Sequence, residues 1–270
     1  MTQPLENQVV LLTGATGGIG REIAILLSQE PIVLLMVARN KGRLKELANE
    51  LNYSNKATLQ LISCDLTDAL QVKEMVHKVI SDYGRIDHVV HAAGVGDFKP
   101  FINFTIHEID EMIEGNTQSV MYLFSYILPH MIKQQAGKWS VIVSSGGYVA
   151  TPSSSVYSAS KFAIIGLTNA LRMELDSKAI QLTTINPGPV DTKFHHRNPH
   201  MESYLERVSW MALRPQVVAQ RIVDNMKRMK MKKEITLPWF LVLAAKGYAL
   251  APRLADWVIT HFFNYKEENL

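Results

Sequence analysis

A tyrosine and a lysine stand four residues apart in the run Val156-Tyr157-Ser158-Ala159-Ser160-Lys161. The surrounding segment is typical of a helix through about residue 176, and this spacing places Tyr157 and Lys161 on one helix face. A phenol has a pKa near ~10 in water, and a neighbouring ammonium favours the phenolate by roughly 1–3 units. The pair could therefore exchange a proton with an alcohol or a carbonyl near neutral pH. Taken alone, such a pair is more often an ordinary helix face.

A glycine-rich run follows the first apolar segment and reads Thr13-Gly14-Ala15-Thr16-Gly17-Gly18-Ile19-Gly20. Glycines let a backbone turn sharply and approach a pyrophosphate, while the free N–H groups of the next helix face the negative charge. A predicted strand precedes the run and a predicted helix at 21–29 follows it. This context indicates a dinucleotide site rather than a simple tight turn.

The second predicted strand ends in Val37-Ala38-Arg39-Asn40, with no acid to bond a ribose 2′-hydroxyl. Arg39 offers a planar fork of donors that can grip a phosphate, which favours NADP(H) over NAD(H). The alternative is that Arg39 only caps a helix start. Asp65, after the third predicted strand, could bond an adenine amino group or N-cap the next helix.

These motifs need a sheet to position them, and the apolar pattern predicts one. Short apolar runs that suit buried strands alternate with helical patterns and stand at 9–12, 32–37, 59–62, 88–90, 141–143 and 182–185, with a last strand near 234–237. Alternation of this kind predicts an α/β, doubly wound parallel sheet with helices on both faces. We expect one dinucleotide-binding and catalytic domain over 1–237, with a substrate lid at about 193–213.

Composition restricts the function further. The 270 residues are 47% hydrophobic and 20% charged, with a net charge of +3, so a folded protein is expected and nucleic acid is an unfavoured partner. The single cysteine, Cys64, excludes an internal disulfide and a multi-cysteine metal site. The first residues do not resemble a secretory signal, so we expect a cytoplasmic location.

The C-terminal residues 238–270 depart from the strand-helix rhythm. Apolar stretches between 238 and 263 are interrupted by Lys246, Arg253 and Asp256, which argues against a transmembrane helix. We expect a C-terminal helical extension that packs on the domain or on a sister subunit. An interfacial membrane helix is the alternative.

Two further runs, Val141-Ile142-Val143-Ser144-Ser145 and Ile185-Asn186-Pro187-Gly188-Pro189-Val190-Asp191-Thr192, complete a pattern of ordered motifs. Over about residues 6–195 this pattern resembles the short-chain dehydrogenase/reductase family, in its oxidoreductase branch. The resemblance implies a seven-stranded parallel sheet, a Rossmann fold. The cofactor contacts expected from the motifs and the resemblance are Gly14, Thr16, Gly18, Ile19, Gly20, Arg39, Asp65, Ala93, Gly94, Tyr157, Lys161, Pro187, Gly188 and Thr192.

The resemblance also implies catalytic roles. Tyr157 matches the acid/base, Lys161 the residue that lowers its pKa and holds the nicotinamide ribose, and Asn116 the residue that anchors a relay water. Ser144 stands 13 residues before Tyr157, at the family's usual interval, and would bond the substrate oxygen. Choosing Ser145 instead would require a one-residue deletion.

The chain departs from the family after the fourth predicted strand. Where the family usually has Asn-Asn-Ala-Gly, this chain has His91-Ala92-Ala93-Gly94. The small residues still let the backbone approach a cofactor. The bonds that the asparagines would make are in doubt, and we expect His91 to be a structural histidine.

The predicted lid begins with a cationic run that holds His195, His196 and His200. We expect no metal site there, because the carboxylate or thiolate partners cannot be inferred. A solvated loop is the default reading of the cations, and an anionic substrate the alternative. Apolar lid residues suit an apolar substrate or simple core packing, and they are Met201, Tyr204, Leu205, Trp210 and Met211.

The sequence therefore predicts an NADP(H)-dependent carbonyl reductase or alcohol dehydrogenase, with Tyr157 as general acid/base and a small-molecule substrate. One alternative is a non-catalytic NADP(H)-binding regulator. Another is a membrane-docked reductase of a lipid-like ketone. By resemblance, helices around 117–134 and 155–176 would form a homodimer or homotetramer.

Overall fold

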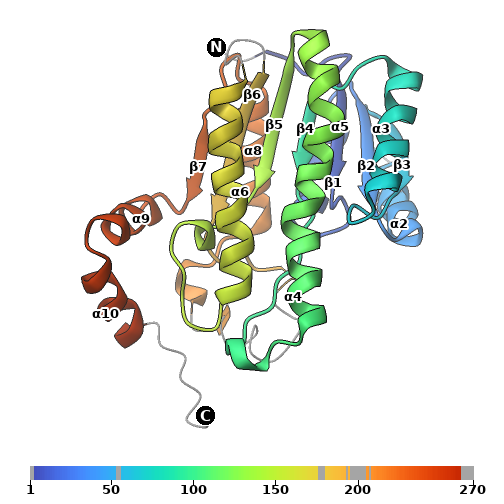
Figure 1. Cartoon of the computed structure of the whole chain (residues 1–270). Coiled ribbons are helices and arrows are strands. Elements are labelled where there is room, and N and C mark those ends of the chain that lie inside the picture. The colour runs from blue at the N-terminus through green and yellow to red at the C-terminus, as the bar shows by residue number, and fades with distance from the viewer. Residues whose placement is uncertain are drawn as a thin grey trace.

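The computed structural model describes residues 3–52, 56–175, 180–192, 194, 205–206 and 208–262. Within them, seven parallel strands form one sheet in the order β3-β2-β1-β4-β5-β6-β7 (Figure 1). The strands are β1 (Val9–Thr13), β2 (Val33–Ala38), β3 (Thr58–Ser63), β4 (His88–His91), β5 (Gly137–Ile142), β6 (Ile180–Pro187) and β7 (Glu234–Leu237). The predicted doubly wound, seven-stranded sheet is confirmed.

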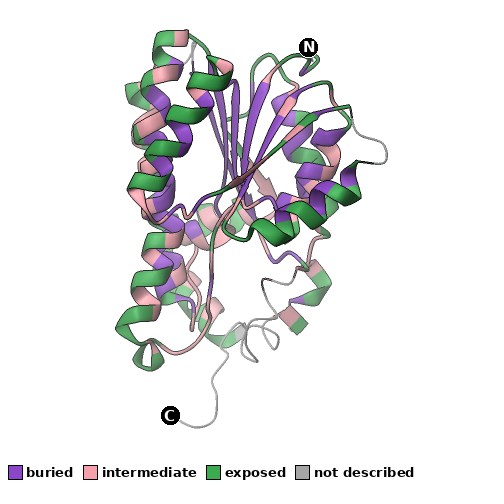
Figure 2. Ribbon diagram, turned by 90° about the vertical axis from the view of Figure 1, so that its right-hand side faces the viewer, coloured by how far each residue is buried: buried purple, intermediate pink, exposed green. Residues whose placement is uncertain are grey.

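Helices cover both faces of the sheet, because successive residues of each strand point to opposite sides. Val9 and Leu11 of β1 belong to a core with α3 (Ala69–Tyr83), α5 (Ser119–Gln134) and α6 (Ser155–Glu174). Val10 and Leu12 belong to a second core with α1 (Gly18–Ser28), α2 (Lys41–Leu51) and α8 (Pro215–Met226). Figure 2 shows the buried strands between helices whose buried stripes face them.

The helix starts follow from local capping. Asp68 accepts hydrogen bonds from the amides of Leu70 and Gln71 at the start of α3, and Gly84 ends that helix at a φ of 71°. Thr105 and Glu108 form a capping box at the start of α4 (Ile106–Ile113). The chain then passes without a break through a π-helix, η2 (Glu114–Gln118), into α5.

One buried charge fixes the far end of the sheet. Lys138 of β5 is 9% exposed, and its ammonium donates to the carbonyls of Met226 and Arg228 at the end of α8, at 3.1 and 2.9 Å. A cation at a helix C-terminus is favoured by the helix dipole. The predicted strand at 141–143 therefore begins earlier, at Gly137, because this lysine has partners inside the core.

The C-terminal extension forms α9 (Leu241–Leu250) and α10 (Pro252–Phe262), which project from the β7 side of the body (Figure 1). Of the two alternatives expected for its packing, the domain contacts only the start of the extension in the described part of the chain, and a sister subunit stays a prediction. No side chain described in α9 or α10 is buried, and Leu250 and Trp257 are 86% and 54% exposed. Contact with the body is concentrated at the start of the extension, where Leu241 lies against Gly188 and Phe240 stacks on Trp210.

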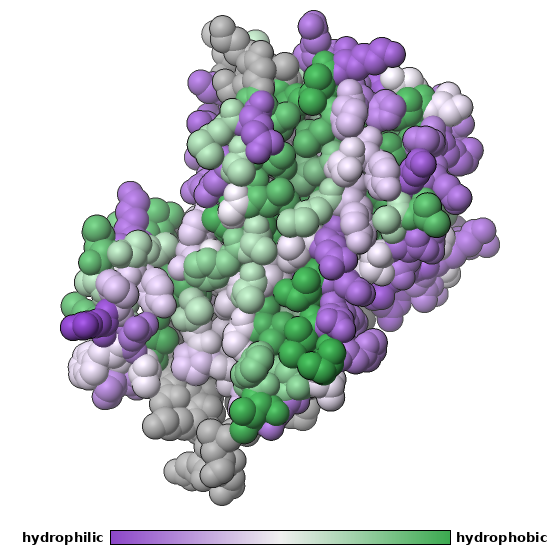
Figure 3. All heavy atoms as spheres, viewed as in Figure 1, coloured by the Kyte–Doolittle hydropathy of each residue, from purple (hydrophilic) through white to green (hydrophobic). Residues whose placement is uncertain are grey.

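Two further surface features belong to the described part of the chain. None of its helices combines the length and apolar character needed to cross a membrane. Apolar side chains gather on the surface over α4 (Figure 3). Ile106 of α4 is exposed, as are Phe101 and Ile102 of the short helix η1 (Phe101–Asn103).

Candidate active site

A cleft of about 580 Å³ opens where the strand order reverses, at the carboxyl ends of the central strands. It brings together most of the predicted site: Thr16, Gly18, Ile19, Gly20, Ala93, Gly94, Ser144, Tyr157, Lys161, Pro187, Gly188 and Thr192 all line it. Four predicted residues, Gly14, Arg39, Asp65 and Asn116, are not among the lining residues.

Gly14 acts on the cleft through packing. It adopts a φ of 65°, and an added Cβ would lie 2.6 Å from main-chain atoms of Ala92 and Ala93. At Gly20 an added Cβ would overlap the carbonyl oxygen of Gly14. Both glycines are thus required by the protein's own packing, which presses the loop after β1 against the end of β4.

The helix that follows this loop presents unoccupied donors to the cleft. Its N-cap, Gly17, supplies no side-chain hydrogen bond, and no acidic residue lies in the first turn. Gly17, Gly18, Ile19 and Gly20 all line the cleft. First-turn amides without a cap, at the positive end of a helix dipole, suit a phosphate group.

Tyr157, Ser144 and Lys161 converge at the other side of the cleft. Ser144 ends the segment after β5, where its Oγ accepts from the amide of Gly146 at 3.0 Å and shares a hydrogen bond with the Tyr157 phenol. The Lys161 ammonium lies 5.5 Å from the centre of the Tyr157 ring and is 5% exposed. Among the described residues it has no hydrogen-bond acceptor, so this buried cation is available to a ligand's oxygen atoms.

Burial opposes the lowering of the Tyr157 pKa expected from Lys161, and that role of Lys161 stays a prediction. Burial raises the pKa of Tyr157 to about 12, against a smaller opposite effect of the Ser144 hydrogen bond. Burial also lowers the pKa of Lys161 to about 8. Desolvation disfavours the charged form of both groups and outweighs their attraction at this separation.

Asn116 positions the site from the π-helix. Its Oδ1 accepts from the amide of Val95 at 2.8 Å, and its Nδ2 donates to the carbonyl of Val95 and to Ser160 Oγ, each at 2.9 Å. Ser160 in turn donates to the carbonyl of Tyr157. Asn116 is fully buried and ties the loop after β4 to the helix that carries Tyr157 and Lys161. A π-turn inside a helical run is often found at functional sites.

Arg39 and Asp65 lie near the end of β2 and after β3. The structure assigns neither of them the helix cap considered as an alternative, because Asn40 caps α2 and Asp68 caps α3. Arg39 is exposed, and Asp65 accepts from the amide and hydroxyl of Thr67. Arg43, which the sequence analysis missed, does line the cleft. The sequence signal that could have identified Arg43 is its position four residues after Arg39.

His91, which stands where the family usually has an asparagine, links two neighbouring strands. Its Nδ1 lies 2.9 Å from Thr13 Oγ1, which links β4 to β1 at the start of the glycine-rich loop. Burial, with a contribution from Lys161, lowers the pKa of His91 to about 3. The expectation of a satisfied structural histidine is met only in part, because Nδ1 bonds Thr13 whereas the buried Nε2 has no hydrogen-bond partner among the described residues.

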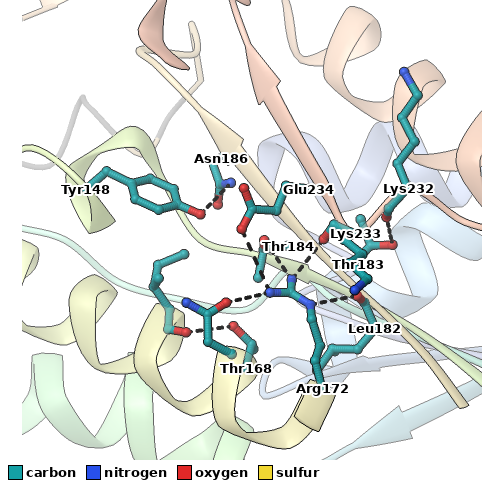
Figure 4. A network of polar contacts seen from close by, with 12 residues as sticks. Tyr148, Thr168, Arg172, Leu182, Thr183, Thr184, Asn186, Lys232, Lys233 and Glu234 are labelled. Carbon is teal, nitrogen blue, oxygen red and sulfur yellow. Dashed lines mark hydrogen bonds and ion pairs between the residues drawn. The ribbon is translucent and has the colours of Figure 1, made fainter. Parts of the chain in front are cut away.

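The turn after Ser144 is anchored to the sheet edge by a polar network (Figure 4). Tyr148 accepts a hydrogen bond from Asn186 of β6 at 3.4 Å, and burial and the nearby Glu234 of β7 raise its pKa to about 12. Arg172 of α6 pairs with Glu234 at 3.8 Å and donates to Thr184 at 3.0 Å. Strands β6 and β7 thus hold both the serine turn and the far end of the tyrosine helix.

Aromatic side chains line the cleft beside Tyr157, and the sequence analysis did not single them out. They are Phe98 and Phe194. The predicted apolar lid residues Trp210 and Met211 are not lining residues, and Trp210 is largely exposed against Phe240. Other predicted lid residues, including His195, His196, His200, Met201 and Tyr204, lie outside the described residues, where no position is assigned. Within the described part, no group of three or more metal-binding side chains is assembled.

Comparison with known proteins agrees with this geometry. A family model described as short chain dehydrogenase matches residues 8–203. An uncharacterised oxidoreductase of Staphylococcus epidermidis is 34% identical over 188 residues, which cover 70% of this chain and 80% of the relative.

Solved structures share the fold. An alcohol dehydrogenase from the archaeon Thermococcus sibiricus, complexed with 5-hydroxy-NADP, is 27% identical with a TM-score of 0.76, covering 86% of this chain and 96% of that one. A short-chain dehydrogenase/reductase from Burkholderia phymatum, in complex with NAD, is 19% identical with a TM-score of 0.83, covering 93% and 95%.

Replacement of His91 tests its structural role through the pH dependence of stability. Its pKa is about 3 in the folded chain and about 6.5 in an unfolded one, so the unfolded state binds more protons below pH 6.5. Stability is therefore lost as the pH falls. Between pH 7.5 and 5, urea unfolding should show wild type losing about 2 kcal/mol more than His91→Asn, which can still bond Thr13.

Two further variants complete this test. His91→Ala leaves the buried Thr13 hydroxyl without its partner and should be less stable than His91→Asn by about 1–3 kcal/mol at pH 7.5. His77→Asn, at an exposed position of α3, serves as the control. An identical pH slope for wild type and His91→Asn would contradict the buried neutral histidine.

Proposed function

The chain belongs to the short-chain dehydrogenase family, and from that membership we propose that it is an NADP(H)-dependent oxidoreductase that interconverts a carbonyl and an alcohol. The observation that carries the proposal is the convergence of Ser144, Tyr157 and Lys161 in one cleft with an uncapped helix N-terminus. Ser144, Tyr157 and Lys161 suit proton transfer at an oxygen atom, and the uncapped helix N-terminus suits a phosphate.

Tyr157 is the proton carrier in this proposal. With a pKa of about 12 the phenol holds its proton at neutral pH and can give it to a substrate oxygen during carbonyl reduction. Ser144 bonds the same oxygen and stabilises the charge that develops on it. In the reverse direction Tyr157 must first lose its proton, so alcohol oxidation should rise with pH.

The remaining groups bind and orient. The amides of Gly18, Ile19 and Gly20 would hold a pyrophosphate, and the Lys161 ammonium would bond ribose hydroxyls, which gives this buried cation its acceptors. When bound, a nicotinamide supplies or accepts the hydride. Asn116 would hold a relay water through its main-chain carbonyl, because both protons of its side-chain amide already bond Val95 and Ser160.

Two arginines support the preference for NADP(H). Arg39 is exposed at the end of β2, and Arg43 lines the cleft from the first turn of α2. Guanidinium groups bind a phosphate through charge-assisted, bidentate hydrogen bonds. The archaeal alcohol dehydrogenase at 27% identity was solved with an NADP derivative and the Burkholderia phymatum protein with NAD, so the preference rests on the two arginines.

We also propose that the protein forms a homodimer or homotetramer through α5 and α6. Large apolar side chains are exposed on both helices and include Met121, Ile132, Phe162 and Met173.

A charge on this face should disfavour association. Light scattering should therefore report a smaller assembly for Phe162→Glu than for wild type, and a wild-type monomer would contradict the proposal.

Removal of the Tyr157 hydroxyl tests the reaction. With NADPH and a panel of aldehydes and ketones, Tyr157→Phe should lower kcat by about 10²–10⁴-fold because the proton donor is gone. NADPH binding, followed by its fluorescence, should remain. Tyr83→Phe, at the end of α3 and away from the cleft, is the matched control. Retained turnover in Tyr157→Phe would contradict the assignment, and cofactor binding without turnover by wild type would favour a regulator.

Removal of the arginine charges tests the cofactor preference. Arg39→Ala and Arg43→Ala should each raise KM for NADPH by about 10–100-fold, the value of one charge-assisted hydrogen bond, and leave KM for NADH unchanged. Lys45→Ala removes an exposed charge from the same helix α2 and should alter neither constant. An equal rise for both cofactors would show that the arginines do not read a 2′-phosphate.

A further inference from the structure

Two phenylalanine rings contact the ring of Tyr157. Phe98, from the segment after β4, meets it edge to face with ring centres 5.3 Å apart. Phe194, from the segment after β6, lies with its ring centre 6.1 Å away and its plane tilted by 60°. Both side chains line the cleft, so the surface beside the reactive phenol is aromatic on two walls.

Gly96 provides the space in which the Phe194 ring rests. An added Cβ at this position would overlap the ring, with the Cε1 atom 2.9 Å away. The backbone of Gly96 is outside the left-handed region, so its conformation does not itself require glycine. Glycine is therefore required at this position because a side chain would collide with the Phe194 ring, and not because of the backbone conformation.

Few charged side chains line the described part of the cleft. Among the described lining residues, the charged side chains besides Lys161 are Arg21 and Glu22 of α1, Arg43 of α2 and Asp191 after β6. The proposed function assigns Lys161 to the cofactor. Within the described part of the cleft lining, the aromatic walls, together with Val149, offer a substrate apolar surface, and no cation besides Lys161, Arg21 and Arg43 lines it.

We propose that Phe98 and Phe194 form an apolar substrate subsite beside Tyr157, that its ligand is an uncharged carbonyl compound or alcohol with an alkyl or aryl group, and that Gly96 is a positioning residue that seats Phe194. The proposal rests on the proposed function of the same cleft. It follows from the ring contacts, the space at Gly96 and the apolar lining beside Tyr157.

Binding of two matched ketones tests the subsite without turnover. Acetophenone is neutral, whereas 4-acetylbenzoate is the same aryl ketone with a carboxylate. Calorimetry should be performed on the free protein and on protein loaded with NADP⁺, in which a ketone cannot be reduced. Wild type should bind acetophenone at least about tenfold more tightly, because burying an unpaired carboxylate against aromatic walls is costly.

A double-variant cycle tests the role of Gly96. Gly96→Ala and Phe194→Ala should each weaken acetophenone binding by about tenfold. The double variant should bind like Phe194→Ala alone, because the added methyl group has no ring left to displace. A role of Gly96 in stability alone would not give this non-additivity. Gly247→Ala adds a methyl group with no atom within 4 Å and serves as the control. Phe98→Ala tests the second wall.

The outcomes separate this proposal from the function on which it rests. Equal binding of the two ketones, no binding of acetophenone, or additive effects in the double variant would overturn the subsite. If the binding pattern holds but no carbonyl supports NADPH consumption, the reaction is wrong and the apolar subsite stands. If consumption depends on Tyr157 but the pattern is absent, the subsite alone is wrong.

Discussion

The cleft depends on one close approach, between the loop after β1 and the end of β4. Gly14 has no side chain, and a Cβ there would collide with the main chain at Ala92 and Ala93. The start of α1, whose N-cap gives no side-chain hydrogen bond, lines the cleft that this contact borders. The same small residues let deeper groups approach, since a Cβ on Gly94 would lie 2.9 Å from Asn116 Oδ1.

Burial then sets the chemistry of the groups that this contact gathers. It raises the pKa of Tyr157 and lowers the pKa values of Lys161 and His91, and each shift favours the neutral form. Burial of this kind strengthens electrostatic attraction toward a charged ligand, because the local dielectric constant is lower than that of water. The low dielectric therefore makes these buried polar groups more selective for ligands that supply their missing hydrogen-bond partners.

The sequence predicted the sheet because parallel strands buried on both faces are continuous apolar runs, and it predicted the cleft because its motifs follow strand ends. It did not predict the buried Lys138, whose partners are carbonyls at the end of α8. The sequence analysis did not foresee that burial raises the pKa of Tyr157, because spacing on a helix indicates proximity but not desolvation. Phe98 and Phe194 were missed because aromatic residues in loops carry no periodic signal.

The strand order has a consequence for synthesis of the chain. β1 can pair with β2 early, but its other edge waits for β4, which begins at His88. At roughly 5–20 residues per second, that edge stays open for several seconds on the ribosome. The waiting strand holds Val10 and Leu12, which are fully buried in the finished fold. The nascent chain thus presents an unpaired apolar edge, a template for aggregation, and a premature stop before β4 would make that edge permanent.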